Sequence, residues 1–155
     1  MLVNHRPRSL TTLGYVVECH GVQLRAQLRS VATLVEVTGR ASAANRELVL
    51  AHLRRFTMVR GPLVIDMLDR DGFDAELLQD LIYTIEEDPD FADTDVTLVV
   101  DPALRETMPS PGRVDVVDSV GQALRDITER INARRAFVMK SLAGLASRRQ
   151  ASGCR

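Results

Sequence analysis

The sequence predicts an α/β fold, in which a mixed β-sheet begins with an antiparallel hairpin and continues with βα units whose helices pack on the sheet. Residues 22–29 alternate strictly between apolar and polar side chains, which is typical of a strand with one solvated face. Residues 63–65, Leu-Val-Ile, form an unbroken apolar run that indicates a strand buried on both faces. An amphipathic helix follows that run, and this order of elements favours a mixed sheet covered by helices.

At 155 residues the chain is long enough for one hydrophobic core and short for two. Its two cysteines, Cys19 and Cys154, lack metal-ligand spacing, which favours a reducing cytoplasm. No apolar signal segment follows the N-terminus, and no run approaches the ~18 apolar residues of a membrane span. We therefore expect a cytoplasmic protein without a transmembrane segment. Its parts are an N-terminal extension (residues 1–20), one domain (21–133) and a basic C-terminal helical extension (134–155).

Charge is unevenly distributed along the chain, although the net charge is only −1. Residues 61–124 hold 16 acidic and 3 basic residues, a net charge of −13, whereas residues 1–60 and 125–155 each carry +6. An acidic middle segment repels phosphate groups, so we expect no nucleic acid partner. The distribution suits a partner with a basic surface, or the basic ends of the chain itself.

A hairpin precedes the first predicted helix. Residues 10–17 fit either an additional strand or a loose arm, whereas residues 22–29 and 32–37 are expected to pair as antiparallel strands. Ser42 is the expected N-cap of the helix that follows, which should end near Phe56.

The central strand–loop–helix unit carries the candidate binding surface. The strand of residues 63–65 ends in Asp66, and an acidic loop leads to Asp74 as the expected N-cap of the next helix. Glu76 falls in the first turn of that helix, where negative charge suits the helix dipole, and the helix should end near Glu87. Open α/β sheets place their binding sites at the carboxyl ends of the strands, where this loop lies.

The last third of the domain repeats the strand–helix pattern. Residues 96–100 are expected to form a buried strand, and Asp101 followed by proline starts a short helix. Residues 114–117 form a short strand, after which Ser119 and Gln122 fit a capping box that opens another helix.

The residue patterns give little support for catalysis or metal binding. No histidine stands in a motif with a nucleophile or a carboxylate, and there is no glycine loop of the kind that cradles phosphates. The acids Asp66, Asp69, Asp71 and Asp74 suggest a magnesium-dependent phosphoacceptor pocket, but such a fold needs further acids on its first strand. The acidic loop of residues 86–95 lacks the glycine and the closing glutamate of a calcium loop and is expected to be solvated. We therefore expect no catalytic residues, no cofactor and no metal.

Residues 132–149 remain compatible with a helix, in which apolar side chains alternate with basic ones. Such a helix can lie on an anionic membrane or dock on a partner. The simpler expectation is a terminal helix that packs on the chain's own acidic domain or in a homodimer.

In order and spacing, these elements resemble the STAS domain (sulphate transporter and anti-sigma factor antagonist family) over roughly residues 22–133. The likeness rests on Gly39 after the second strand, on residues 63–66, on residues 73–74 before the central helix, and on residues 118–124 at the start of the last one. Family members without a membrane domain typically bind a kinase-type anti-sigma factor and free the sigma factor that it held. The resemblance therefore implies a regulatory binding module whose partner is such a factor or another STAS protein.

In the family, a serine in the pattern Asp-Ser-Ser-Gly-Leu is phosphorylated to release the partner. The corresponding residues here are 74–78, Asp-Ala-Glu-Leu-Leu, so Glu76 occupies the phosphorylation position. The resemblance implies that the partner-binding residues are Asp74, Ala75, Glu76, Leu77 and Ser42. Glu76 carries about one negative charge against −1.5 to −2 for a phosphate. It either mimics the phosphorylated state or marks a lost switch; alternatively, it is an ordinary glutamate that stabilises a helix start by ~0.3–1 kcal/mol.

A second class of function also fits the sequence. In it, the domain has a structural or scaffold role and assembles with itself, or with another STAS protein, through the basic C-terminal helix.

Overall fold

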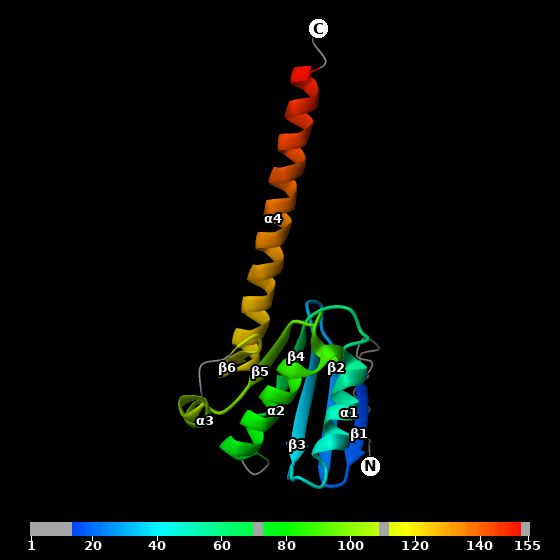
Figure 1. Ribbon diagram of the computed structural model, residues 1–155, viewed down its shortest axis with the longest axis vertical. Coiled ribbons are helices and arrows are strands. Elements are labelled where there is room, and N and C mark those ends of the chain that lie inside the picture. The colour runs from blue at the N-terminus through cyan, green and yellow to red at the C-terminus, as the bar shows by residue number, and fades with distance from the viewer. Residues whose placement is uncertain (1–13, 70–72, 109–111, 153–155) are drawn as a thin grey trace, which may run out of the picture.

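The computed structural model of the protein describes residues 14–69, 73–108 and 112–152, and within these residues one mixed sheet carries helices on both faces (Figure 1). In chain order the strands are β1 (Gly14–Cys19), β2 (Val22–Leu28), β3 (Thr33–Gly39), β4 (Leu63–Asp66), β5 (Val96–Val99) and β6 (Asp115–Val117). The helices are α1 (Arg46–Phe56), α2 (Ala75–Glu87), the 3₁₀ helix η1 (Pro89–Phe91), α3 (Pro102–Thr107) and α4 (Val120–Ser152).

The strands follow one another across the sheet in sequence order, from β1 to β6. The pairs β1–β2 and β2–β3 are antiparallel, whereas β3–β4, β4–β5 and β5–β6 are parallel. The predicted fold class and the predicted hairpin are therefore confirmed. The sheet begins at Gly14, seven residues before the expected start of the domain at residue 21, because β1 pairs with β2 along its whole length. Residues 10–13 of the suggested additional strand lie outside the described residues.

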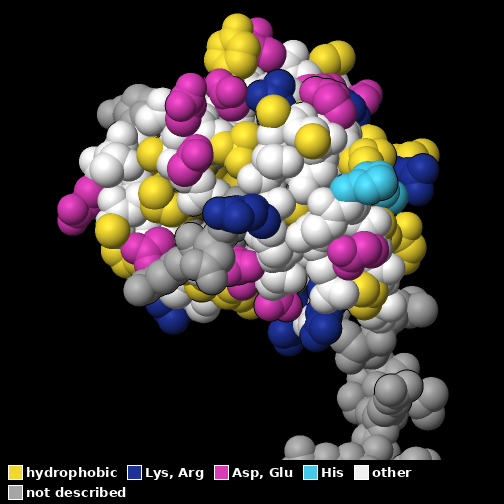
Figure 2. Space-filling model, turned by 90° about the horizontal axis from the view of Figure 1, so that it is seen from below, with side chains coloured by type: hydrophobic (Ala, Val, Ile, Leu, Met, Phe, Trp, Pro, Cys, Tyr) yellow, Lys and Arg dark blue, Asp and Glu magenta, His cyan; other side chains and the backbone are white. Residues whose placement is uncertain are grey.

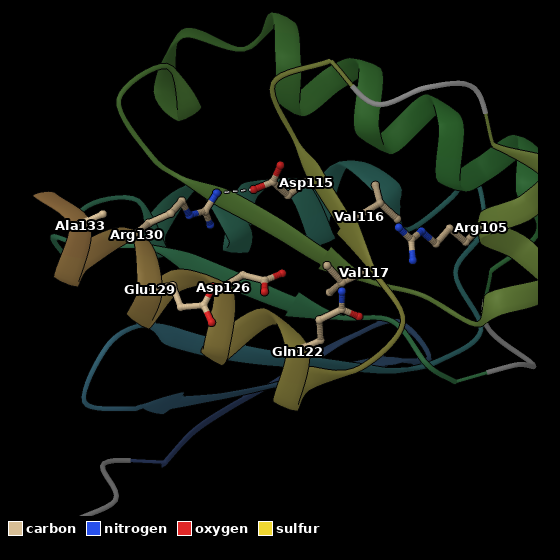
Figure 3. Close-up of a pocket in the computed structure, with 9 residues that line it drawn as sticks. All are labelled: Arg105, Asp115, Val116, Val117, Gln122, Asp126, Glu129, Arg130 and Ala133. Atoms are coloured by element: carbon tan, nitrogen blue, oxygen red, sulfur yellow. Dashed lines mark hydrogen bonds and ion pairs between the residues drawn. The ribbon is translucent and has the colours of Figure 1, made fainter.

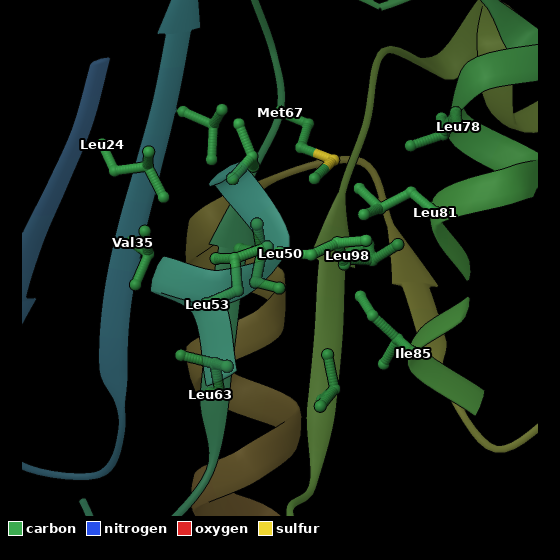
Figure 4. Close-up of a cluster of buried hydrophobic side chains, with 14 of the residues drawn as sticks. Leu24, Val35, Leu50, Leu53, Leu63, Met67, Leu78, Leu81, Ile85 and Leu98 are labelled. Atoms are coloured by element: carbon green, nitrogen blue, oxygen red, sulfur yellow. The ribbon is translucent and has the colours of Figure 1, made fainter. Parts of the chain in front are cut away.

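Two hydrophobic cores lie on opposite faces of the sheet, and β4 contributes to both. Leu63 and Ile65 belong to the core that also contains Leu53 of α1 and Leu81 of α2. Figure 4 shows Leu63 among the side chains of this core. Val64 points to the other face and packs with the first half of α4. All three apolar residues of β4 are at most 1% exposed, as the unbroken apolar run predicts.

Helix α4 is continuous over 33 residues and lies in two environments. Its first half packs on β4, β5 and β6, whereas residues 132–151 are exposed and project away from the domain (Figure 1). The expectation that the terminal helix packs on the chain's own acidic domain is therefore wrong. At 1.5 Å per residue, the helix is longer than the sheet is high, and roughly 30 Å of helix extends beyond the sheet. Within the described residues, no helix combines the length and apolarity needed to cross a membrane.

The acidic loop between α2 and β5 is more ordered than the prediction of a solvated loop suggested. Phe91 in η1 is fully buried, and Asp88 caps η1 through a hydrogen bond from the Asp90 N–H. The Nε of Arg54 donates to Asp88 at 2.7 Å, and this hydrogen bond holds the pKa of the Asp88 carboxyl below its usual range. Burial of one aromatic ring therefore anchors a loop whose other side chains remain largely exposed.

Gly39 closes β3 at a position where the backbone comes very close to the turn between β1 and β2. Its φ of +96° lies in the left-handed region, and a Cβ there would approach the carbonyl oxygen of Gly21 to 2.1 Å. Real Cβ atoms do not approach backbone oxygen so closely, so glycine is required on two separate grounds at this position.

We predict that Gly39→Ala lowers the free energy of unfolding by more than about 2 kcal/mol, because it adds a backbone clash to the cost of a left-handed φ. Gly21→Ala is the matched control: Gly21 has a φ of +92° but nothing lies within 4 Å of its Cβ position. The control should lose only about 1–2 kcal/mol. Urea denaturation followed by circular dichroism measures both, and equal losses would show that the close approach does not matter.

Candidate protein-binding surface

The parallel strands end at one edge of the sheet, which we call the carboxyl edge, and the predicted binding residues lie there. The loops after β3 and β4 both start from this edge, and the turn between β1 and β2 lies beside the end of β3, since Val22 pairs with Gly39. Figure 2 looks onto this edge and shows acidic side chains spread over it between hydrophobic side chains and fewer basic ones. Residues 132–152 of α4, which we call the free half of this helix, project from the opposite edge (Figure 1).

Asp74 caps α2 as predicted. Its Oδ1 accepts a hydrogen bond from the Leu77 N–H at 2.7 Å, and its backbone is extended immediately before the helix. Asp74 and Glu76 are exposed, while Ala75 and Leu77 are half-buried and Leu77 packs against the core. The start of α2 therefore presents two carboxylates to solvent on a helix that the core holds in place.

Ser42 is not the N-cap of α1, which corrects the sequence prediction. The helix begins at Arg46 and Asn45 precedes it, while Ser42 lies exposed in the turn before. The Ser42 N–H donates to the Asn45 side-chain oxygen at 2.8 Å, and the Ser42 carbonyl accepts from the Asn45 and Arg46 N–H groups. Ser42 thus belongs to the loop at the carboxyl edge without being its anchor.

Asn45 is the anchor of that loop, and sequence reasoning missed it. The side chain is 2% exposed, and its amide nitrogen donates to the carbonyl oxygens of His20 at 3.1 Å and Arg40 at 3.0 Å. These bonds join the turn after β1 to the loop after β3. Asparagine is a favoured N-cap residue, so its place before the helical pattern was a signal for the helix start. The Asn45 side chain makes no capping hydrogen bond, however, and its bonds to the loop had no local signal.

A hydrogen bond connects the two loops that carry the predicted residues. The Gly39 N–H donates to Oδ2 of Asp69 at 2.7 Å, which links the end of β3 to the loop after β4. Farther out, Nη1 of Arg46 lies 3.2 Å from Asp80 and joins α1 to α2. The structure therefore places Ser42 and residues 74–77 on neighbouring loops of one edge. Asp71, the remaining member of the set Asp66, Asp69, Asp71 and Asp74, lies outside the described residues.

The surroundings of Asp66, at the end of β4, disfavour the ionised form of its carboxyl group. Asp66 faces the same side of the sheet as Val64, in register with Glu36 of β3 and Val99 of β5. Burial raises the pKa of the Asp66 carboxyl, and Glu36 raises it further, while a hydrogen bond from the Leu68 N–H at 3.1 Å lowers it. Ionised Asp66 is thus held at the carboxyl edge at a cost in stability.

A separate hollow of about 620 Å³ lies between β6 and α4 at the outer edge of the sheet (Figure 3). Its charged side chains include Asp115, Asp126 and Arg130, and Arg130 donates to Asp115 at 2.5 Å. None of the predicted partner-binding residues lines it. Within the described chain, no group of three or more His, Cys, Asp or Glu side chains is placed to hold a metal ion.

The carboxyl edge combines charged and apolar groups. It offers exposed carboxylates at a helix start, a half-buried leucine beside them, and loops fixed by hydrogen bonds to buried groups. Groups held this way suit a partner with basic and apolar side chains, because they lose little conformational entropy when they are bound.

The sequence is similar to Osmosensory protein A of Mycobacterium tuberculosis (strain ATCC 25618 / H37Rv). The two are 33% identical over 132 residues, which cover 79% of this chain and 82% of that protein. No family model matches the sequence, and no solved structure matches it.

We predict that Asp66→Asn raises the free energy of unfolding at pH 7. The folded-state pKa lies above the unfolded one, so the stability linked to protonation is complete below the unfolded-state pKa and is lost as pH rises through the folded-state pKa. Asparagine has the shape of protonated aspartate, and the Leu68 N–H keeps an acceptor. The advantage of the variant should therefore disappear below about pH 4.

Urea denaturation at a series of pH values measures this difference. Glu106→Gln makes the same charge change at an exposed acid of α3 and should shift stability by less than about 0.5 kcal/mol. An Asp66→Asn variant that is less stable than wild type at pH 7 would contradict the assignment.

Proposed function

The chain belongs to the same family as Osmosensory protein A of Mycobacterium tuberculosis, and from this premise we propose that it is a regulatory protein that acts by binding another protein. Its binding surface is the start of α2 with the neighbouring loop, formed by Asp74, Ala75, Glu76, Leu77 and Ser42. The observation that carries the proposal is the start of α2, where Asp74 fixes the helix and Glu76 remains exposed beside it. The name of the relative further suggests a role in the response to osmotic change.

We propose a kinase-type anti-sigma factor as the partner, in line with the resemblance to STAS anti-sigma factor antagonists. The sheet begins with an antiparallel hairpin, as the resemblance implies, and Glu76, which the resemblance assigns to the phosphorylation position, is exposed in the first turn of α2. In this proposal the protein works in the cytoplasm by occupying its partner and performs no chemical step. In this proposal the switch is lost, and Glu76 is a contact residue at the position where STAS anti-sigma factor antagonists carry the serine whose phosphorylation releases the partner.

A role in assembly is the second candidate function, and the free half of α4 favours it. Large apolar side chains on this half are open to solvent, among them Val138, Leu142 and Leu145 at 52%, 56% and 58% exposure. Surface helices of monomeric proteins seldom carry such side chains along their length, so this half of the helix is suited to contact with another protein chain.

We predict that at least one purified kinase-type anti-sigma factor binds the protein at micromolar concentration. Glu76→Arg should weaken this binding about tenfold or more, because reversal of a charge inside a docked surface costs 1.4 kcal/mol or above. Glu87→Arg makes the same change at the far end of α2 and should leave the affinity within about twofold. Isothermal titration calorimetry measures both. If no factor in a panel of such proteins binds, the antagonist proposal is wrong, although the description of the fold still holds.

We also predict that residue 76 cannot be phosphorylated in the wild-type protein and becomes a phosphorylation site when serine replaces Glu76. When the protein is incubated with the partner kinase and ATP, mass spectrometry should find no phosphate at residue 76 of wild type, whereas Glu76→Ser should acquire it. Glu76→Ala is the control that lacks any acceptor at this position. A binding partner that leaves Glu76→Ser unmodified would show that the active site of the kinase does not reach the start of α2.

A further inference from the structure

The apolar stripe that packs α4 on the sheet continues along the free half of the helix. Over residues 120–131 the stripe consists of Val120, Ala123, Leu124, Ile127 and Ile131. Beyond the domain it continues as Val138, Leu142 and Leu145, which are 52%, 56% and 58% exposed. Side chains three, four and seven positions apart share one face of a helix. The free stripe therefore faces the same side as the buried one, above the edge at which the parallel strands begin, which we call the amino edge.

The face that carries this stripe is also basic. Residues 132–152 contain five basic residues and no acidic one. Arg134 and Arg135 lie four and three positions before Val138, and Arg149 lies four after Leu145, so these cations fall within the stripe or beside it. A helix that lies in a membrane surface keeps its cations on the polar face. Cations mixed with apolar side chains suit an acidic protein surface instead.

Such an acidic surface exists on the amino edge of this chain, at the base of the free half. Asp95 lies 4.0 Å from Arg134, which places the loop before β5 beside the stripe. In the same loop Asp93 is exposed and lines a hollow of about 380 Å³. Val59 and Arg60 also line it, so the hollow combines acidic, apolar and basic groups. Two of the acids of the loop thus lie where a second helix against the stripe would end.

We propose that two copies of this chain pair through the free halves of α4, side by side and antiparallel about a two-fold axis near Leu142. Leu142 is the midpoint of residues 132–152, so each helix ends where the domain of the other copy begins. Val138 of one copy then meets Leu145 of the second, and Arg148 and Arg149 reach the Asp93–Asp95 loop of the second copy. The proposal identifies the contact behind the assembly role and rests on that second candidate function, independently of partner binding at the carboxyl edge.

Charge decides the direction of the pairing. Two parallel helices would set Arg148 and Arg149 of one copy against the same residues of the other and would leave both acidic loops at the far end. Two antiparallel helices also bring these cations near Arg134 and Arg135 of the other copy, but there the acidic loop of that copy lies beside them. The antiparallel arrangement brings the basic end of each helix to the acidic loop of the other copy. Because the contact is two-fold symmetric, it closes on itself and forms a dimer, with no further copies added.

The first test measures mass by size-exclusion chromatography with light scattering at about 100 µM chain, above the micromolar Kd of a weak interface. Wild type should show twice the chain mass of 17.2 kDa. Leu142→Glu places two carboxylates opposite each other at the axis and should give monomer. Lys140→Glu lies two residues away, on nearly the opposite side of the helix, and should remain dimeric. Circular dichroism of the full chain confirms that each variant keeps its helix content.

The second test exchanges charges between the two surfaces. The variant Arg148→Glu/Arg149→Glu places acids against the acidic loop, and Asp93→Arg/Asp95→Arg places bases against the basic helix end. Each variant alone should be monomeric, and an equimolar mixture should form the dimer, because both ends of the mixed pair then match in charge. Native mass spectrometry should find one copy of each variant in that dimer.

Three results would overturn the proposal. These are monomeric wild type at the stated concentration, dimers of Leu142→Glu as stable as wild type, or a charge-exchanged mixture that stays monomeric. Monomeric wild type that sediments with vesicles of anionic lipid would assign the stripe to a membrane. If Leu142→Glu is monomeric and still binds the anti-sigma factor, then assembly and partner binding are separate, so either proposal can fail without the other.

Discussion

Burial of β4 on both faces is the constraint on which the rest of this structure depends. Leu63 and Ile65 are covered by α1 and α2, and Val64 is covered by α4, so three apolar residues connect two cores. Each buried aliphatic side chain contributes roughly 1.5–3 kcal/mol. The sum for this strand is comparable to a large part of the net stability of a small domain. A strand fixed from both sides cannot shift its register, and the loop that leaves it begins at a fixed point. The direction of Asp66 and the start of α2 follow from that placement.

The carboxyl edge shows that residues of the proposed binding surface also hold the loops in place. Asp74 uses one oxygen to cap α2, yet the residue remains exposed. Asn45 and Asp69 contribute to the surface indirectly, because their hydrogen bonds hold the loops after β3 and β4 in position. Glu76 lies in the first turn of α2, where its negative charge stabilises the start of the helix. The acids of this surface are spread over several loops, an arrangement that fits the proposed role in binding.

Helix α4 shows that one sequence pattern can have two outcomes along a single element. Its apolar stripe keeps the same spacing from Val120 to Leu145, but the sheet covers only the first half. Where the sheet ends, the stripe loses its intramolecular cover, and the residues around it change from mixed charge to uniformly basic. The carboxyl edge and the free half of α4 lie at opposite ends of the molecule, so two contacts can form without interfering with each other (Figure 1).

The sequence by itself determined the elements whose signals are local. The alternation of β2, the apolar run of β4, and the caps Asp74, Asp101 and Ser119 all rest on neighbours a few residues apart, and each is where those patterns predicted it. Only the tertiary structure decided the features that depend on distant partners. Asn45 replaced Ser42 as the residue before α1 because its amide reaches His20 across 25 positions of the chain, and Asp69 meets Gly39 across 30. The direction of α4 was likewise beyond the sequence, because a helix pattern records which face is apolar but not where the supporting sheet ends.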